Sequence, residues 1–296
     1  MIKLHLWFFI FILNLEIIKY ECKNIFFFGG LVLGEYFEGH YYKHQKGENT
    51  LCFIVGKSTS EEFIQIVANS KAYHVPFIGE NQFSFSGIKV DIDTEQVRVE
   101  GEITYKELSP IKYDVMGPLK YIPLECRHKV VSMYHKLSGK VILNNEEFDF
   151  EDGAGYIEGD SGTSFPKAYL WIQSNDFPEK CSIMASVADV PVFGVSIRGC
   201  ICIIQYQGEE YRLSSYLGGR LLKCSKNQII FKQGKYKLEI NVDSKNGLAL
   251  KAPTKGEMTR IIYEDASCPA NFKFYRNKEL IFNMSSLHTS FEYENI

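Results

Sequence analysis

Short segments in which apolar and polar residues alternate recur along the chain, and Gly, Asn, Asp and Pro residues separate them. Successive side chains of a β-strand point to opposite faces of a sheet, so this two-residue period is typical of strands. The pairs Asn144-Asn145, Gln207-Gly208 and Gln233-Gly234 are suited to hairpin turns. The sequence therefore predicts an all-β chain, with strands near 50–55, 87–91, 96–105, 140–143, 182–187, 195–205, 210–213, 228–232 and 235–242.

Helical periodicity is scarce. A single turn or short helix is predicted at 60–68, because Ser60 precedes two glutamates as at a helix N-terminus. Aromatic residues make up 14% of the chain, and their rings fit half-buried pleated surfaces, which favours sheet. The same rings also suit the wall of an apolar pocket.

A long connection is predicted at 109–123, which holds three of the nine prolines and little alternation. New strands begin just beyond it. The chain is accordingly divided into an apolar N-terminal segment (1–34), a β-rich half (35–125) and a second β-rich half (126–296) with the main motif. Each half is large enough for a small barrel or sandwich.

The N-terminal segment contains an apolar run from Leu4 to Leu15, behind Lys3. It is too short to span a bilayer comfortably, and no small-x-small cleavage site follows it. For residues 1–22 three interpretations stay open: a signal peptide, an interfacial anchor or a first strand. The eight cysteines form no CxxC pair and have no zinc-ligand spacing, so we interpret them as small buried hydrophobes. We expect a cytoplasmic protein for which the N-terminal segment offers peripheral membrane contact.

Several classes of function are disfavoured. A net charge of -3 and the lack of a long basic run argue against nucleic-acid binding. No Gly-x-Ser-x-Gly elbow indicates a hydrolase, and the glycines between 153 and 162 lack the GK[ST] of a phosphate-binding loop. Arg198, Arg212 and Arg220 are predicted to be surface ion-pair partners, and His135 a core side chain.

The densest cluster of chemically useful residues lies at 156–177. Glu158 and Asp160 are two apart and share one side of an extended backbone, and Gly159 and Gly162 permit a sharp turn around them. After Pro166 the chain alternates, so that one face carries rings and amides and the other carries Leu170 and Ile172; the first face holds Tyr169, Trp171, Gln173, Asn175 and Phe177. The acids are candidate acid–base groups, or else they cap a bulged turn that leads into the strand. Calcium is a weaker alternative, because the spacing is not that of an EF-hand.

A second candidate is the segment FEGHYYKHQ. An extended backbone places Glu38, His40, Tyr42 and His44 on one face. Imidazole and carboxylate are common metal ligands, but two histidines along one strand lie too far apart to share an ion unaided. We therefore predict no metal site here, and interpret the face as structural or as an acid–base cluster.

The motif Glu158-x-Asp160-x-Gly162, followed by Phe165-Pro166 and by Trp171-Ile-Gln173-x-Asn175-x-Phe177, resembles the tocopherol cyclase family. Three further segments agree in order: Phe37-Glu38-Gly39, His135-x-Leu-x-Gly139 and Leu250-Lys-Ala-Pro-Thr254. The resemblance covers the chain from about Tyr36 to its end. His40, Ser161 and Tyr169 stand where the family or its plant members have Trp, which leaves the particular substrate open.

The resemblance implies two lipocalin-like antiparallel barrels or strongly curved sheets packed together. It also implies a cyclisation, without cofactor or metal, of an apolar prenylated hydroquinone to a chromanol or a related isoprenoid. A carboxyl group would protonate the double bond, for which Glu158, Asp160 and Glu38 are the candidates. Substrate binding is assigned to Phe165, Tyr169, Trp171, Gln173 and Asn175.

Two other classes of function remain open. A noncatalytic lipocalin-like binder of an isoprenoid, quinone or other apolar lipid would use the same side chains as pocket walls. A structural β-protein without a small ligand would have a filled interior.

Overall fold

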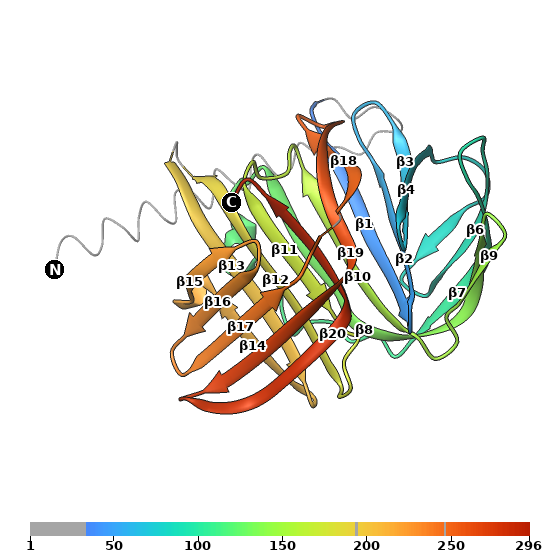
Figure 1. The fold of residues 1–296 in the computed structure, drawn as a ribbon. Helices are drawn as coiled ribbons and strands as arrows, with labels where there is room; N and C mark the ends of the chain where they lie inside the picture. The colour runs from blue at the N-terminus through green and yellow to red at the C-terminus, as the bar shows by residue number, and fades with distance from the viewer. Residues whose placement is uncertain (1–33, 193–194, 246) are drawn as a thin grey trace. The chain divides into compact units, whose positions relative to one another are not determined.

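Two large antiparallel sheets make up the part of the chain that this computed structural model describes, which is residues 34–296 apart from 193–194 and 246. The first sheet takes ten strands between Phe37 and Gly162, and the second takes ten between Tyr169 and Glu294. The blue-to-green strands of the first sheet lie on the right of Figure 1, and the yellow-to-red strands of the second lie on the left. The prediction of an all-β protein with two curved, lipocalin-like sheets is confirmed.

In the first sheet the strands follow the order β4-β3-β2-β1-β10-β8-β7-β6-β5, and β9 pairs with β8. Their bounds are β1 (Phe37–Lys46), β2 (Asn49–Lys57), β3 (Glu62–Ala68), β4 (Lys71–Pro76), β5 (Gln82–Ser84), β6 (Gly87–Asp93), β7 (Arg98–Lys106), β8 (Cys126–Leu143), β9 (Glu146–Asp149) and β10 (Ala154–Gly162).

In the second sheet the order is β14-β13-β12-β11-β20-β19-β17-β16-β15, and β18 pairs with β19. Their bounds are β11 (Tyr169–Ser174), β12 (Cys181–Val192), β13 (Val195–Tyr206), β14 (Glu209–Ser214), β15 (Arg220–Ser225), β16 (Gln228–Gln233), β17 (Tyr236–Val242), β18 (Leu248–Thr254), β19 (Glu257–Arg276) and β20 (Glu279–Glu294).

The two sheets share a connectivity that no residue-level repeat reveals. Because β1 pairs with β10 and β11 with β20, the first and last strands of each sheet lie side by side. Each sheet therefore curls as in an up-and-down barrel. Each also begins with a four-strand meander and has one additional strand, β9 or β18, outside the main order.

Each curled sheet encloses an apolar core, and a third core lies between the sheets. β11 shows how the alternation divides the side chains. Leu170 and Ile172 point into the core of the second sheet, and Tyr169 and Trp171 point into the core between the sheets, so the two pairs lie on opposite faces, as predicted. All six residues of β11 are buried, so the strand is covered on both faces.

The helix predicted at 60–68 is wrong. This segment forms β3, which pairs with β2 on one side and β4 on the other. Ile64 and Ile66 pack in the core of the first sheet, while Val67 packs between the sheets. Burial on both faces removes the polar alternation that would identify a strand, so Ser60 and the two glutamates after it are a misleading helix signal.

The chain passes from one sheet to the other between Gly162 and Tyr169, later than the division predicted between 125 and 126. The long connection was correctly placed, because 107–125 joins β7 to β8. However, β8 returns to the first sheet and pairs with β7, so this connection does not separate the sheets. The predictions for residues 1–22, including membrane contact, lie outside the described residues. Among the described residues there is no helix of the length and apolarity needed to cross a membrane.

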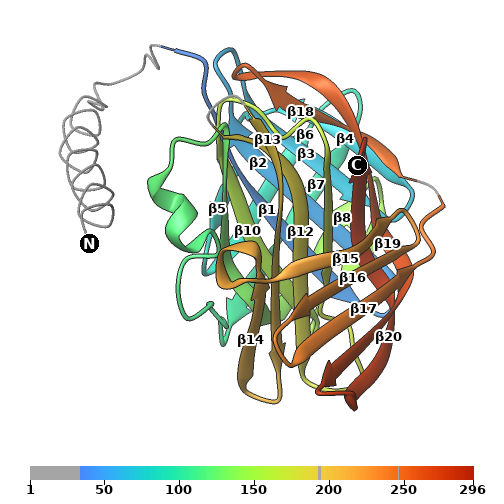
Figure 2. The same cartoon turned by 90° about the vertical axis from the view of Figure 1, so that its left-hand side faces the viewer.

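The connection 107–125, called the strap below, packs against the second sheet. It contains the 3₁₀ helix η1 (Gly117–Tyr121), which lies beside η2 (Ser215–Leu217) after β14. Figure 2 shows the strap in green, running outside the strands. Ser109 near its start donates to the side chain of Gln205 on β13 at 2.7 Å.

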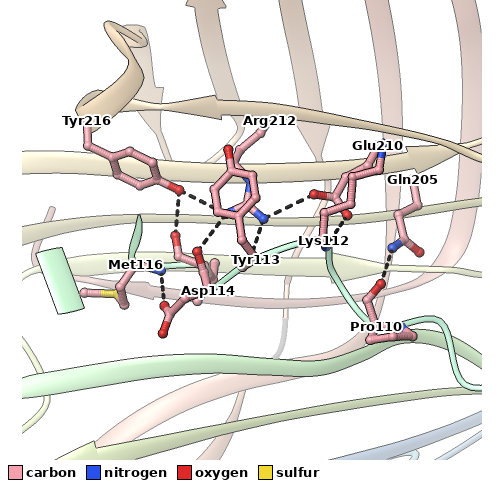
Figure 3. A network of polar contacts seen from close by, with 10 residues as sticks. Pro110, Lys112, Tyr113, Asp114, Met116, Gln205, Glu210, Arg212 and Tyr216 are labelled. Carbon is pink, nitrogen blue, oxygen red and sulfur yellow. Dashed lines mark hydrogen bonds and ion pairs between the residues drawn. The ribbon is translucent and has the colours of Figure 1, made fainter. Parts of the chain in front are cut away.

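Arg212 of β14 holds the middle of the strap (Figure 3). Its guanidinium donates to the carbonyl oxygens of Tyr113 at 2.8 Å and Asp114 at 2.9 Å, and to the Tyr216 hydroxyl at 3.0 Å. The guanidinium carbon lies 3.6 Å from the centre of the Tyr113 ring. Glu210 Oε1 forms an ion pair with Arg212 Nη2 at 3.2 Å. Arg212 forms an ion pair, as predicted, but its predicted surface location is wrong, because the strap covers it and leaves it 8% exposed.

Candidate active site

A cavity of about 460 Å³ lies between the two sheets. Strands β1, β2, β3, β8 and β10 supply one wall, and strands β11, β12, β13, β18, β19 and β20 supply the other. The strap contributes Met116, Leu119 and Ile122. Most lining side chains are apolar, and a few polar groups converge among them. Volume and lining are those of a small-molecule site.

The strand register gathers the polar side chains into two rows that face each other. In the first sheet, Tyr41 of β1 stands directly opposite Glu158 of β10. In the second sheet, Trp171 of β11 stands opposite Glu292 of β20, which stands opposite Glu264 of β19. Directly paired residues on neighbouring strands share one face of the sheet. The rows therefore bring residues from both ends of the chain to one interior.

Two hydrogen bonds cross between these rows. The Tyr41 hydroxyl of the first sheet donates to Glu264 Oε1 of the second at 2.5 Å. In the reverse direction, Trp171 Nε1 of the second sheet donates to Glu158 Oε2 of the first at 3.1 Å. Both carboxyl groups are buried, with Glu158 5% and Glu264 0% exposed. Each sheet thus supplies one aromatic donor and one buried acceptor, which fixes the two walls relative to each other.

His128 lies between two carboxyl groups. Its Nδ1 is 3.0 Å from Asp160 Oδ1, and its Nε2 is 3.3 Å from Glu158 Oε2. The antiparallel pairing of β8 and β10 places His128 directly opposite Asp160. The Tyr156 hydroxyl donates to Glu158 Oε2 at 2.6 Å, and the Cys126 thiol lies 3.6 Å from Asp160 Oδ1. We call His128, Glu158 and Asp160 the acid–imidazole cluster.

The electrostatics of this cluster favour an imidazolium. Burial alone would lower the pKa of His128, but the charges of Glu158 and Asp160 and the bonds to them outweigh burial and raise it well above 6.5. Burial and the neighbouring Glu158 also raise the pKa of Tyr156 well above 10, so this phenol stays a donor. The two neighbouring carboxyl groups thus favour the protonated form of His128.

The same three residues are the ones that could hold a divalent metal. Among the described residues, their potential ligand atoms lie within 4.8 Å of one another. A protonated imidazole, however, has no lone pair to offer, so metal binding would first have to displace the proton of His128. The arrangement fits a proton-transfer cluster better than a metal centre.

A second pair of carboxyl groups lies farther along the second sheet. Burial raises the pKa of Glu264 to about 7, against a smaller lowering by Tyr41 and Lys43. Burial, followed by the charge of Glu264, raises the pKa of Glu292 well above 4.5. The Tyr169 hydroxyl donates to Glu292 Oε2. Glu292 borders the cavity, whereas Glu264 lies behind it.

Five of the eight predicted site residues border the cavity, and these are Glu158, Asp160, Phe165, Tyr169 and Trp171. The strand after Pro166 therefore forms part of the cavity wall. Glu38 is not among the lining residues: its side chain is 42% exposed and lies 3.9 Å from Lys57. The opposite face of β1, which carries Phe37, Gly39 and Tyr41, faces the cavity, and His40 also borders it.

Gln173 and Asn175 also lie away from the lining, although they share a face with Trp171. Gln173 is fully buried, and neither of its side-chain atoms has a hydrogen-bond partner among the described residues. Asn175 donates to the carbonyl oxygen of Gly155 at 2.9 Å, which ties β11 to β10. These two amides are placed between the sheets, beyond the cavity.

Sequence reasoning missed His128, Glu264 and Glu292. They lie far in the chain from the 156–177 motif, and only strand pairing brings them to it. The sequence contains one signal for His128. The predicted hairpin turn at Asn144-Asn145 lies midway between His128 and Asp160, so strands that run back from this turn would bring the two residues together. For Glu264 and Glu292 we find no local signal.

Fold and site define a class of protein: two curled sheets that enclose an apolar cavity with a buried acid–imidazole cluster. The chain belongs to the tocopherol cyclase-like family, whose model matches residues 90–293. Two solved structures show the same fold. Kievitone hydratase from Nectria haematococca is 11% identical, with 88% of this chain and 89% of that chain covered and a TM-score of 0.51. CghA, determined with Sch210972, is 7% identical, with 88% of each chain covered and a TM-score of 0.56. A search of curated proteins found no significant match.

Proposed function

We propose that this protein closes a ring in a prenylated hydroquinone by adding a proton to its double bond, which gives a chromanol. The observation that carries the proposal is the imidazole ring of His128 between two carboxyl groups on the wall of an apolar cavity. Membership of the tocopherol cyclase-like family supports the same reaction. The reaction is an isomerisation, so each proton added to carbon must be returned by the hydroxyl group that closes the ring.

Asp160 is the proton donor in this proposal. Oδ1 faces His128 and Cys126, whereas Oδ2 has no hydrogen-bond partner among the described residues, and the side chain borders the cavity. A positive charge bonded to Oδ1 stabilises the carboxylate that remains after the proton leaves.

Glu158 receives the proton that the attacking hydroxyl loses. The proton from Asp160 forms a C–H bond at the less substituted carbon, the π bond breaks, and the hydroxyl oxygen forms a C–O bond at the tertiary cation. His128 lies between Glu158 and Asp160 and returns the proton from one to the other. Protons and electrons then balance over the cycle.

The aromatic walls favour the cationic intermediate. Trp171 and Tyr169 border the cavity beside the cluster, and the faces of such rings attract positive charge. Tyr41 packs edge-on against Trp171, with ring centres 5.4 Å apart, which holds the indole in place. Met116 and Leu119 of the strap keep the tail in apolar surroundings.

The test uses the full chain and geranylhydroquinone, with the chromanol detected by mass spectrometry. Asp160→Asn and Glu158→Gln should each lower kcat by about 10² or more while KM changes little. Glu38→Gln is the matched control, because this acid lies outside the cavity, and it should keep full turnover. Absence of product with the wild-type protein would refute the cyclase proposal, and an unaltered lipid bound in the cavity would then identify a noncatalytic binder.

A further inference from the structure

The cavity reaches the protein surface near the start of β13. Ile197 borders the cavity, yet this residue is 52% exposed. Gly199 lies two residues further along the same face of the strand and also borders the cavity. A Cβ atom added at Gly199 would meet no heavy atom within 4 Å among the described residues beyond its chain neighbours. A half-exposed wall residue beside a glycine that faces open space marks an opening of the cavity.

Strand pairing connects this opening to the aromatic wall beside the acid–imidazole cluster. Tyr169 of β11 stands directly opposite Ala188 of β12, which stands directly opposite Gly199 of β13. All three residues border the cavity. Neighbouring strands lie about 4.8 Å apart, so Gly199 lies about 10 Å from Tyr169 across the sheet. That span is close to the length of a geranyl tail, so a longer tail that starts beside Tyr169 would extend past Gly199.

The strap borders the same end of the cavity. The backbone N–H of Cys200, next to Gly199, donates to Ser215 Oγ of η2 at 2.9 Å, and η2 lies beside η1 of the strap. None of the five residues of η1 is buried, although Leu119 borders the cavity. The strap therefore covers this end of the cavity with a single, thin layer. An apolar chain has a path to the surface between η1 and β13.

We propose that the prenyl tail leaves the cavity over Gly199, between β13 and η1, so that the protein accepts tails longer than the cavity itself. The inference rests on the proposed function for the position of the ring. It makes Gly199 a specificity-determining residue for tail length, because a side chain at this position would fill the opening. The backbone at Gly199 lies outside the left-handed region, so a larger residue fits there without backbone strain.

The test uses the full chain and three probes with one ring: geranylhydroquinone, farnesylhydroquinone and geranylgeranylhydroquinone. Native mass spectrometry should show a one-to-one complex of the wild-type protein with each of them. A wild-type protein that binds the geranyl probe but not the geranylgeranyl probe would overturn the proposal, because the cavity would then be closed at Gly199. Kd is measured by quenching of Trp171 fluorescence, with Trp171→Phe as the reference for the contribution of Trp7.

Variants are compared with wild type for the same probe, which cancels differences in probe solubility. Gly199→Leu should leave Kd of the geranyl probe within about twofold and raise Kd of the geranylgeranyl probe about tenfold or more. Gly199→Val, which suits a strand, should show the same pattern and decides the test if the leucine variant does not fold. Ser196→Leu is the matched control, because Ser196 is exposed on the other face of β13, and it should change neither value.

The outcomes separate this proposal from the proposed reaction. An equal rise in Kd for all three probes in the Gly199 variants, or no rise for any of them, would overturn the tail path. A protein that shows the predicted dependence on tail length but forms no chromanol would refute the cyclisation alone. A protein that binds none of the three probes would refute both.

Discussion

Replacement of Glu264 by Gln should remove a large pH-dependent cost from the folded protein. Glu264 is fully buried, and burial raises its pKa from 4.5 to about 7. Gln has nearly the same shape and can still accept the bond from Tyr41, but it cannot ionise. The substitution therefore tests the electrostatics of the cavity wall with little change in packing.

The magnitude follows from the linkage between pKa and stability. Between about pH 4.5 and about pH 7 the folded protein keeps a proton on Glu264 that the unfolded chain releases, so the free energy of unfolding falls as pH rises. A change from 4.5 to about 7, at about 1.4 kcal/mol per pH unit, corresponds to about 3 kcal/mol lost by about pH 8. The variant should lack this loss.

The assay is urea unfolding followed by tryptophan fluorescence, from about pH 5 to about pH 8. Relative to wild type, the unfolding free energy of Glu264→Gln should rise by about 2.5 kcal/mol over this range, because part of the loss has already occurred at pH 5. Glu279→Gln, at an exposed position at the start of β20, is the matched control for the same substitution and should change the unfolding free energy by less than about 0.5 kcal/mol. A constant difference for Glu264→Gln would refute the reasoning that burial holds this proton.

Three further predictions concern the groups around the cavity. Arg212→Met should lower the free energy of unfolding in urea by about 3–5 kcal/mol, because it leaves Glu210 buried without its ion-pair partner and releases the strap. The matched change Arg198→Met, which breaks the exposed pair with Asp189, should lower it by under about 1 kcal/mol. Equal losses would contradict the strap contacts. His128→Gln should lower the free energy of unfolding most below about pH 6.5, and this loss should shrink as pH rises through the raised pKa of His128. A loss that does not change with pH in the same assay would argue against an imidazolium. Trp171→Phe should lower stability by about 1–3 kcal/mol through the lost bond to Glu158, measured as a shift in Tm; an unchanged Tm would count against that bond.

Local patterns were enough to predict the parts of the site that depend on one strand. The period of two placed Tyr169 and Trp171 on one face and Leu170 and Ile172 on the other, as found. It also placed Glu158 and Asp160 on one side of β10, where both border the cavity. On β1 the same period separates Glu38 from Tyr41, but it does not indicate that the face of Tyr41 is the one that meets the second sheet.

Register between distant strands could not be predicted. The pairing of β8 with β10 shifts between Gly155 and Glu158, and a shift of one residue would place His128 on the opposite face. Glu264 and Glu292 meet through the pairing of β19 with β20, which also contains register shifts. Such irregularities depend on packing over the whole sheet, so the partners of the acids had to come from the structure.

The most direct test of the central claim, that Asp160 adds a proton to the double bond of a prenylated hydroquinone, is the reaction in D₂O. The expected product is a chromanol with one deuterium, on the ring methylene next to the new quaternary carbon, and its formation should fall about 10²-fold or more in Asp160→Asn. A chromanol without deuterium at that carbon, or one formed at the wild-type rate by Asp160→Asn, would contradict it.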